Sequence, residues 1–323
     1  MRRQLIAALG LVASSTLAFA QDWPARPVTM IVPYAAGGPV DTVGRIMAQG
    51  LTEILGQQVI VENVGGAGGM TGTNRVAKAA PDGYTFLLGG TATMTTVPAL
   101  YGAKTPYNPL TDFEHVNQFA DSARILVARK DFPASSLKEF AAYAKANHGK
   151  MQYGSSGAGA GAHICSLLLD LAMGVKITHV PYRGSGPAMQ DLLAGRIDYI
   201  CEQISTAVPQ IKGGTVKPIA LMGLSRAGVL PDVPSATEEG FDIDCASLSA
   251  FAFPKGTPEA IVRRLADATN RAVETAFVRE RLAAVGVVIE PPERRTIDHW
   301  RENLPREVER AVAVVKAGGL SAD

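Results

Sequence analysis

Short runs of β-branched and aliphatic residues alternate with amphipathic helical segments along most of the chain. Residues 28–32, 58–62 and 84–88 have the composition of buried strands, and residues 39–55 and 71–80 have helical spacing between them. A strand, a helix and a second strand in this order form a βαβ unit, in which the two strands lie parallel in one sheet. The alternation therefore predicts an α/β protein in which each sheet is mixed and mostly parallel, with helices on its faces.

The alternation is interrupted at residues 104–109, whose sequence Lys-Thr-Pro-Tyr-Asn-Pro is typical of a crossover. Strands and helices then resume, and the chain ends in two long amphipathic helical segments at 258–276 and 294–316. We expect these last segments to pack on the first lobe, which implies more than one crossover strand and a hinge. The predicted division is a leader at 1–20, lobe 1 at 21–104 plus 225–323, and lobe 2 at 105–224.

The first twenty residues have the pattern of an export signal. Arg2 and Arg3 precede an apolar run at 5–13 that is too short to span a bilayer, and Ala20 ends a small-x-small cleavage pattern. We expect cleavage after Ala20 and a periplasmic protein. The alternative is an ordinary buried N-terminal helix.

Net charge restricts the partners of the chain. The 31 basic and 30 acidic residues give a net charge of +1, and loss of Arg2 and Arg3 leaves 29 − 30 = −1. A nearly neutral protein is not expected to bind nucleic acid or anionic membranes. An anionic ligand would therefore have to be held by local groups.

Cysteine and histidine spacing predicts neither a metal site nor a cofactor. Cys165, Cys201 and Cys245 lack zinc-type spacing, and the five histidines are scattered. Three cysteines in an oxidising compartment allow at most one disulfide. The favoured interpretation is that they are small buried side chains.

A glycine-rich loop joins a strand to a helix at residues 34–38. Gly37 and Gly38 expose backbone amides, and Pro39 suits the first position of the following helix. Free amides at the positive end of a helix form an anion site. Asp41, in the first turn, either faces the ligand or caps its own helix, and a simple tight turn is the alternative for the whole loop.

Residues 153–163 repeat this plan in the second lobe. A short strand leads into a loop of glycine, serine and alanine, and a helix follows. Ser155 and Ser156 add hydroxyl donors to the exposed amides. In open α/β sheets ligands sit beyond the carboxyl ends of the strands, so both loops are predicted to face one cleft between the lobes.

The same glycines fit catalytic motifs poorly. Gly157 and Gly159 match a loose dinucleotide fingerprint, but the acidic residue expected about 20 residues later is missing. Ser155 and Ser156 lack the frame of a nucleophile elbow, and no Walker A lysine is present. We therefore expect a binding protein, with a secreted α/β enzyme as the less favoured alternative.

Together these segments resemble the tripartite tricarboxylate transporter receptors, the Bug or TctC family of periplasmic solute-binding proteins. The resemblance implies a two-lobed periplasmic-binding-protein fold of type II that closes on a small carboxylate, held mainly by backbone amides of the two loops. It also implies a membrane permease with a large and a small subunit as partner, although a sensor protein is an alternative partner. We expect a monomer. The matching segments are residues 27–38, 59–63, 66–69, 76–85, 153–163, 180–184 and 191–195.

Three departures from the family pattern concern the ligand. Val40 stands where many members have threonine, and Val64 and Gly65 stand where an Arg-Pro pair is common. Glu202 stands where many members carry aspartate. The identity of the ligand therefore cannot be transferred from a named relative.

The candidate ligand-binding residues lie on the two loops and at other strand ends. Arg183 and His163 are expected to meet a second carboxylate, and Glu202 a hydroxyl or an ammonium group. Hydroxyl and amide groups after the strands would contact neutral oxygens. The predicted set is Tyr34, Ala36, Gly37, Gly38, Pro39, Val40, Asp41, Thr42, Thr91, Thr93, Ser155, Ser156, Gly157, Gly159, His163, Arg183, Glu202 and Gln203.

Overall fold

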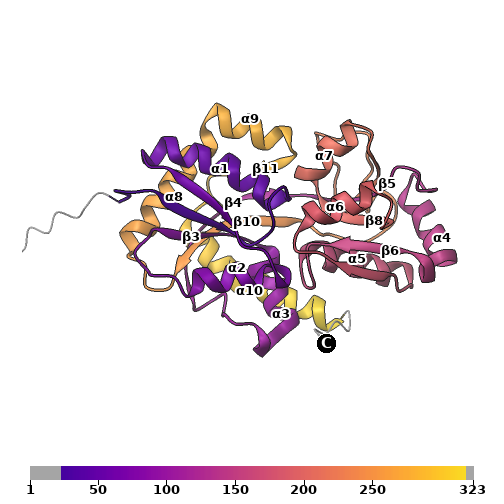
Figure 1. Ribbon diagram of the computed structural model, residues 1–323, viewed down its shortest axis with the longest axis horizontal. Helices are drawn as coiled ribbons and strands as arrows, with labels where there is room; N and C mark the ends of the chain where they lie inside the picture. Colours follow the sequence, from indigo (N-terminus) through magenta and orange to yellow (C-terminus); the bar gives the residue numbers. More distant parts are fainter. Residues whose placement is uncertain (1–22, 318–323) are drawn as a thin grey trace, which may run out of the picture.

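The computed structural model describes residues 23–317, which form two α/β lobes lying side by side (Figure 1). The predicted export signal and its cleavage after Ala20 lie outside the described residues. The strands of the first lobe are β1 (Val28–Val32), β2 (Val59–Asn63), β3 (Thr85–Gly90), β4 (Phe113–Ser122), β10 (Ser247–Pro254) and β11 (Val287–Ile289). Those of the second lobe are β5 (Arg124–Arg129), β6 (Gln152–Ser155), β7 (Thr178–Pro181), β8 (Tyr199–Gln203) and β9 (Val216–Leu221).

Helices cover both faces of each sheet. Those of the first lobe are α1 (Pro39–Leu55), α2 (Met70–Ala77), α3 (Val97–Tyr101), α8 (Glu259–Glu274), α9 (Ala276–Ala284) and α10 (Ile297–Ala317). Those of the second are α4 (Leu137–Asn147), α5 (Gly161–Met173), α6 (Ser185–Leu193) and α7 (Ile204–Lys212). Within residues 23–317 no helix combines the length and the apolar composition needed to cross a bilayer.

Both sheets are mixed. The first has the strand order β11-β4-β10-β3-β1-β2 and the second β7-β6-β8-β5-β9. Four neighbouring pairs are parallel and five are antiparallel. The prediction of mostly parallel sheets is therefore wrong, although each lobe does contain the predicted parallel βαβ units. The antiparallel pairs arise because β10 and β11 run opposite to the other strands of the first sheet, and β5 runs opposite to the other strands of the second.

The change from one sheet to the other occurs later in the chain than the sequence predicts. The strand β4 was expected in lobe 2, but it pairs with β10 and β11 in the first sheet, so the first crossover lies at Ala123 rather than near residue 104. Residues 225–245 were expected in lobe 1 but pack on lobe 2. There Leu230, Val233 and Ile243 join apolar clusters of that lobe.

A disulfide joins Cys165 on α5 to Cys245. It tethers to lobe 2 the segment from which the chain crosses back to the first lobe. Only Cys201, of the three cysteines, remains a free and buried thiol. All three cysteines are buried, as the favoured interpretation has it, but Cys165 and Cys245 form the one disulfide that three cysteines allow. The sequence left this pairing open because residues 80 positions apart give no local indication of contact.

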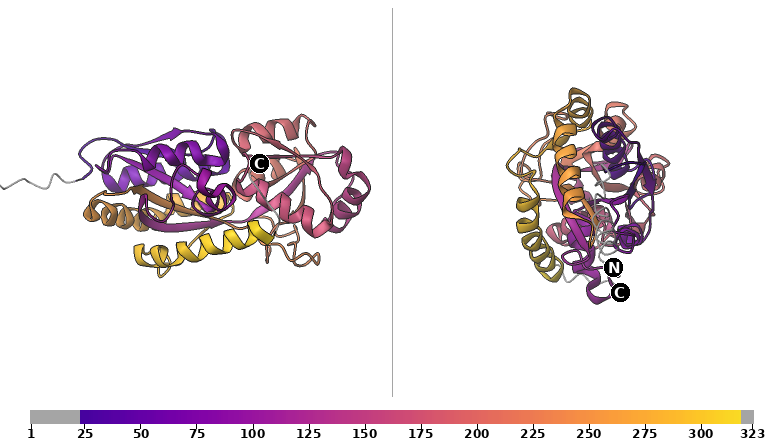
Figure 2. Two further views of the ribbon diagram at one scale, coloured as in Figure 1. Left: turned by 90° about the horizontal axis from the view of Figure 1, so that it is seen from below. Right: turned by 90° about the vertical axis from the view of Figure 1, so that its left-hand side faces the viewer.

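Each lobe has its own core. In the first, α1, α8 and α9 pack on one face of the sheet and α2 and α10 on the other. In the second, α4 and α5 cover one face, and α6 and α7 cover the other. The last helix, α10, runs along the first lobe and ends beside the second (Figure 2).

Local sequence explains where the cleft-facing helix α1 begins and ends. Pro39 occupies its first turn, where a missing amide proton is harmless, and Gly56 ends it in the left-handed conformation at φ 70°. The strand β1 before it lies between β3 and β2 in the sheet and is almost fully buried. The loop between this strand and α1 is consequently held at both ends.

Candidate functional site

A small cavity of about 30 Å³ lies between the two lobes. Its walls come from the ends of strands and the beginnings of helices in both lobes. This volume has room for roughly one water molecule, so the lobes are closed on each other. The lining residues are Tyr34, Pro39, Val40, Gly90, Thr91, Ala92, Arg124, Ser156, Gly161, Ser185, Gln203 and Ser247.

Helix N-termini from both lobes meet at this cavity. The first residues of α1, α5 and α6 line it, as does Gln203, the residue before α7. None of these four helices has a side-chain hydrogen bond at its N-cap. By contrast, Ser136 and Thr275 cap α4 and α9, which do not line this cavity. Uncapped N-termini carry free amides and partial positive charge, which favours an anion.

Two of these N-termini face each other across the cleft. A Cβ built on Gly38, the residue before α1, would lie 3.8 Å from the amide nitrogen of Ser185 and 3.9 Å from that of Gly186 at the start of α6. The neighbouring loops also touch, because the amide of Ala35 donates to the carbonyl of Arg183 at 3.3 Å. Two positive helix ends are thus brought together with only backbone between them.

The first glycine-rich loop is held by a buried carboxylate. The Asp41 side chain accepts hydrogen bonds from the Gly37 amide (2.9 Å), from Arg45 (2.9 Å) and from Asn63 (3.0 Å). Burial by itself would raise the pKa of Asp41, but these hydrogen bonds outweigh burial and lower it below its ordinary value. Asp41 therefore stabilises its own loop, and the amide of Gly37 is already occupied.

The second loop is held by neutral groups. The Ser155 hydroxyl accepts from the Gly157 amide at 3.1 Å and contacts the ring of His179 at 2.6 Å. The Gly159 amide donates to Nδ1 of His163 at 3.0 Å, which requires a neutral ring at that nitrogen. The rings of His163 and His179 stack with 4.1 Å between centroids. Burial lowers the pKa of His163 to about 4 and, together with the nearby His163, that of His179 to about 3.

The lobes touch through glycine. A Cβ on Gly157 would lie 2.8 Å from the amide nitrogen of Gly68, and one on Gly65 would lie 2.7 Å from the carbonyl of Arg183. Gly157 also has a φ of +124°, a conformation that other residues rarely adopt. The closed arrangement therefore requires that these positions carry no side chain.

A model of the tripartite tricarboxylate transporter receptor family matches residues 43–320. The chain belongs to this family. A relative from Agrobacterium vitis, described only by its place in the ttuE-ttuC' intergenic region, is 41% identical over 305 residues, covering 94% of this chain and 88% of that protein.

Solved structures of similar proteins share the fold. The periplasmic binding protein BugD is 36% identical, with a TM-score of 0.90, over 93% of this chain and 99% of that one. MatC from Rhodopseudomonas palustris, solved with bound malate, is 38% identical, with a TM-score of 0.87, over 90% and 99% of the two chains. The receptor thus has a periplasmic-binding-protein fold, and its family is one of binding proteins rather than enzymes.

The receptor brings only some of the predicted residues to the cavity wall. Those that line it are Tyr34, Pro39, Val40, Thr91, Ser156 and Gln203. The others lie behind it or at the lobe contact; they are Ala36, Gly37, Gly38, Asp41, Thr42, Thr93, Ser155, Gly157, Gly159, His163, Arg183 and Glu202. Several of these have structural partners instead. The Thr42 hydroxyl donates to the Gly38 carbonyl, and the Thr93 hydroxyl to that of Gly90.

Glu202 is fully buried, one strand position away from the cavity. Its Oε1 accepts from the amide of Gln203 at 2.8 Å, while Oε2 has no hydrogen-bond partner among the described residues. Burial raises the pKa of Glu202, although the Gln203 amide and the charge of Arg124 oppose this shift. The side chain is therefore positioned to balance buried charge rather than to line the cavity.

The lining residues absent from the predicted set are Gly90, Ala92, Arg124, Gly161, Ser185 and Ser247. Arg124 begins the strand β5, and its side chain is 7% exposed. A charged residue at the start of the apolar run Ile125–Ala128 was the available indication, because buried strands rarely admit an unpaired cation. The two serines carry no comparable pattern in the sequence.

A second cavity of about 320 Å³ adjoins the first. Thr91, Arg124 and Gly161 line both cavities. The remaining wall is rich in charge of both signs. Asp121 lies there beside Glu290, and burial together with that neighbouring carboxyl group raises the pKa of Asp121 to about 7. The other charged or polar side chains of this wall are Thr95, Thr96, Gln118, Asp244, Arg294, His299, Asn303, Glu307 and Arg310.

Proposed function

We propose that this receptor binds the carboxylate of a small organic acid between its lobes and delivers the acid to a permease with one large and one small membrane subunit. The observation that carries the proposal is the opposition of the α1 and α6 N-termini across the cleft. Two positive helix ends in this arrangement repel each other until an anion lies between them. An anionic ligand therefore favours the closed form over the open one.

Such a site can bind a carboxylate with micromolar affinity even when the protein has no large net positive charge. A carboxylate that accepts about four charge-assisted hydrogen bonds gains roughly 6–12 kcal/mol before ordering costs. Micromolar affinity corresponds to about 8 kcal/mol. Backbone amides at the helix ends are thus sufficient, which agrees with the nearly neutral charge of the chain.

The relatives support an organic acid and a periplasmic location. MatC was solved with malate, a dicarboxylate with a hydroxyl group, and BugD is described as a periplasmic binding protein. We infer that the export signal predicted at residues 1–20 directs this receptor to the same compartment. There it would capture its ligand before contact with the permease.

A calorimetric screen of mono-, di- and tricarboxylates, with the matching amides as controls, tests the proposal. We expect at least one acid to bind and to raise the melting temperature, because a ligand at about 100 times its Kd stabilises the fold by about 2.7 kcal/mol. Chromatography after incubation should return the acid unchanged. The proposal is rejected if no carboxylate binds, and its binding-protein character is rejected if the ligand is converted.

Delivery to the permease is tested separately. Membrane vesicles containing the large and small subunits should accumulate the labelled acid only when the purified receptor is added. Equal accumulation without the receptor would contradict the proposed transport role while leaving ligand binding intact.

A further inference from the structure

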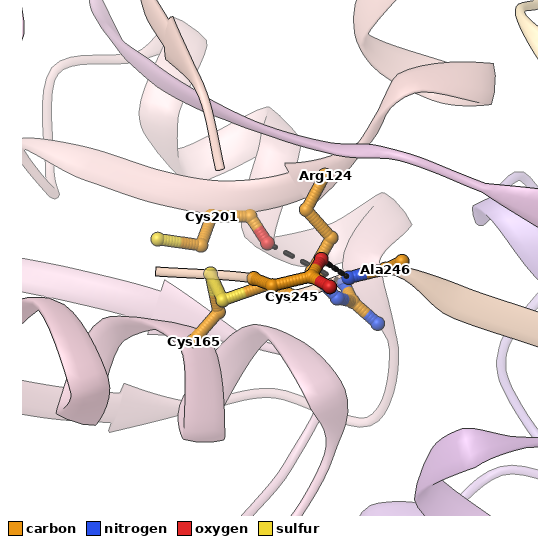
Figure 3. The surroundings of a disulfide bond; sticks show 6 residues. Arg124, Cys165, Cys201, Cys245 and Ala246 are labelled. Atoms are coloured by element: carbon orange, nitrogen blue, oxygen red, sulfur yellow. Dashed lines mark hydrogen bonds between the residues drawn. A yellow bond between two sulfur atoms is a disulfide. The ribbon is translucent and has the colours of Figure 1, made fainter. Parts of the chain in front are cut away.

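Arg124 carries a buried positive charge that no neighbouring acid pairs. Within residues 23–317 its guanidinium forms no ion pair, and its single hydrogen bond is to the carbonyl of Cys201 at 3.5 Å. Figure 3 shows the guanidinium beside the Cys165–Cys245 disulfide and Ala246. An unpaired buried charge is unfavourable, and the loss of hydration lowers the pKa of Arg124. An anion brought to this position would relieve that cost.

Glu202 acts on the charge of Arg124 from within the fold, but it is not an ion-pair partner. Glu202 lies on β8, opposite Ile125 and one position along from Arg124 in the strand pairing. Its Oε1 accepts a hydrogen bond from the amide of Gln203, and the carboxylate is outside ion-pair distance of the Arg124 guanidinium. Glu202 therefore offsets the charge of Arg124 only at longer range.

Arg124 stands where a ligand has room to extend. The cleft cavity of about 30 Å³ has room for roughly one water molecule, whereas the adjoining cavity is about 320 Å³. Arg124, together with Thr91 and Gly161, forms the wall that the two cavities share. A ligand anchored at the helix N-termini would therefore meet Arg124 as it extends towards the larger space.

The chain preserves space for this guanidinium at Gly161. A Cβ at that position would overlap the Arg124 guanidinium, which lies directly against the first residue of α5, so a side chain there would displace the guanidinium. Arg124 and Gly161 thus form a matched pair that holds a cation at an uncapped helix N-terminus. Both features add positive potential at the same point.

We infer that Arg124 is a specificity-determining residue that binds a second anionic group of the ligand, so that the receptor selects acids with two anionic groups over those with one. This inference rests on the proposed carboxylate-binding function. A guanidinium can donate two parallel hydrogen bonds to a carboxylate, a geometry that neither an amide nor a hydroxyl reproduces. Discrimination against the neutral analogue is expected to be roughly 10- to 100-fold.

Calorimetry with diacids and their half-amides tests the role of Arg124. The probes are malonate, succinate, glutarate and adipate, each beside the half-amide in which one carboxylate is neutral. The wild-type receptor should prefer at least one diacid over its half-amide by about 10- to 100-fold. Arg124→Gln should reduce that preference to about threefold or less by weakening binding of the diacid more than that of the half-amide, and Arg124→Lys should keep part of the preference.

The control variant is Arg129→Gln on the same strand. Arg129 pairs with Asp131 and Asp198 and lines neither cavity, so its loss should leave the diacid preference intact. If Arg124 has only a structural role, through Glu202, then Arg124→Gln should weaken the binding of diacid and half-amide equally. That result overturns the inference. An unchanged preference in Arg124→Gln overturns it too.

Two further results are decisive. If Arg124→Gln does not fold, the diacid preference of Arg124→Lys is the deciding measurement. A preference that is fully retained or fully absent in that variant contradicts a charged two-point contact. If neither diacids nor half-amides bind the wild-type receptor, the role of Arg124 is rejected, and the wider carboxylate screen decides whether the proposed function stands. Binding of half-amides with no diacid preference leaves that function standing and rejects the role of Arg124.

Discussion

The two glycine-rich loops face the same cleft, but different chemistry holds each of them. In the first, the ionised carboxylate of Asp41 accepts a hydrogen bond from the amide of Gly37. In the second, the hydroxyl of Ser155 and the neutral ring of His163 accept from glycine amides. In both loops, therefore, glycine amides that the sequence pattern predicts to be free for a ligand already donate to side chains of the protein. The amides left for an anion belong to the first turns of the helices that follow.

Because of this difference, we expect the two loops to respond differently to pH and to substitution. The first loop depends on a charge whose pKa is lowered, and the second on groups that must remain uncharged. The second loop also leads into a helix that is covalently tied to the return crossover, whereas α1 has no such tie. The following changes test these contrasts, from the largest expected effect to the smallest.

Removal of the disulfide should have the largest effect. The Cys165→Ser/Cys245→Ser variant is expected to lose about 4–5 kcal/mol of unfolding free energy, because the bond closes a loop across 80 residues and restricts the unfolded chain. Urea unfolding followed by circular dichroism measures this loss. Reductant should destabilise the wild type and leave the variant unaffected. Equal stability of the two proteins without reductant would show that the tie is unimportant.

A side chain at the lobe contact should prevent closure. Gly157→Val is expected to weaken binding of the best carboxylate by about 100-fold, or about 2.7 kcal/mol, because its Cβ would overlap Gly68 across the cleft. Calorimetry measures the affinity, and small-angle scattering should show no ligand-induced compaction. Gly214→Val is the matched control, with a positive φ but no neighbour within 4 Å. Similar losses in both variants would attribute the effect to backbone strain.

Removing the side chain that holds each loop should cost less. Asp41→Ala is expected to lower the unfolding free energy by about 1–3 kcal/mol, and Ser155→Ala by about 1–2 kcal/mol, since each leaves a glycine amide without its acceptor. Denaturant unfolding of the two variants beside the wild type gives both values. Losses under about 0.5 kcal/mol would mean that water replaces these side chains.

Mild acid should affect the second loop before the first. The folded-state pKa values of His163 and His179 lie near 4 and 3, so the unfolded chain takes up protons first as pH falls below about 6.5, and stability declines over that range. The pKa of Asp41 is also lowered, but its contribution is lost only below about pH 4, where an ordinary aspartate becomes protonated. Melting temperatures between about pH 4.5 and 7.5 measure the decline. The His163→Asn/His179→Asn variant should show a shallower slope, and an unchanged slope would assign the effect to other groups.

The sequence predicts the two α/β lobes and the two strand-loop-helix units well because local pattern determines them. Hydrophobic runs, Pro39 and the glycines act over a few residues, and the structure confirms the strand before α1 and the helix after it. The wrong assignment of β4 has a different origin. Which sheet a strand joins depends on pairing with β10, more than 120 residues later, and no local pattern reports it.

The site was harder to predict than the fold. Glycine content indicates a loop that approaches a ligand, but it does not say which amides are already bonded to Asp41, Ser155 or His163. These acceptors lie within a few residues of their loops, so only the folded geometry distinguishes capping from ligand contact. Arg124 was hidden for another reason, since its burial results from the packing of α5 and the crossover segment around it.

The glycine contacts between the lobes have a consequence for release. Backbone against backbone removes little apolar area from water, and each Å² of such area contributes only about 25 cal/mol. The glycine contacts themselves therefore add little to the energy that holds the lobes together. A ligand bonded to both lobes would add to that energy, so separating the lobes would also mean breaking bonds to the ligand.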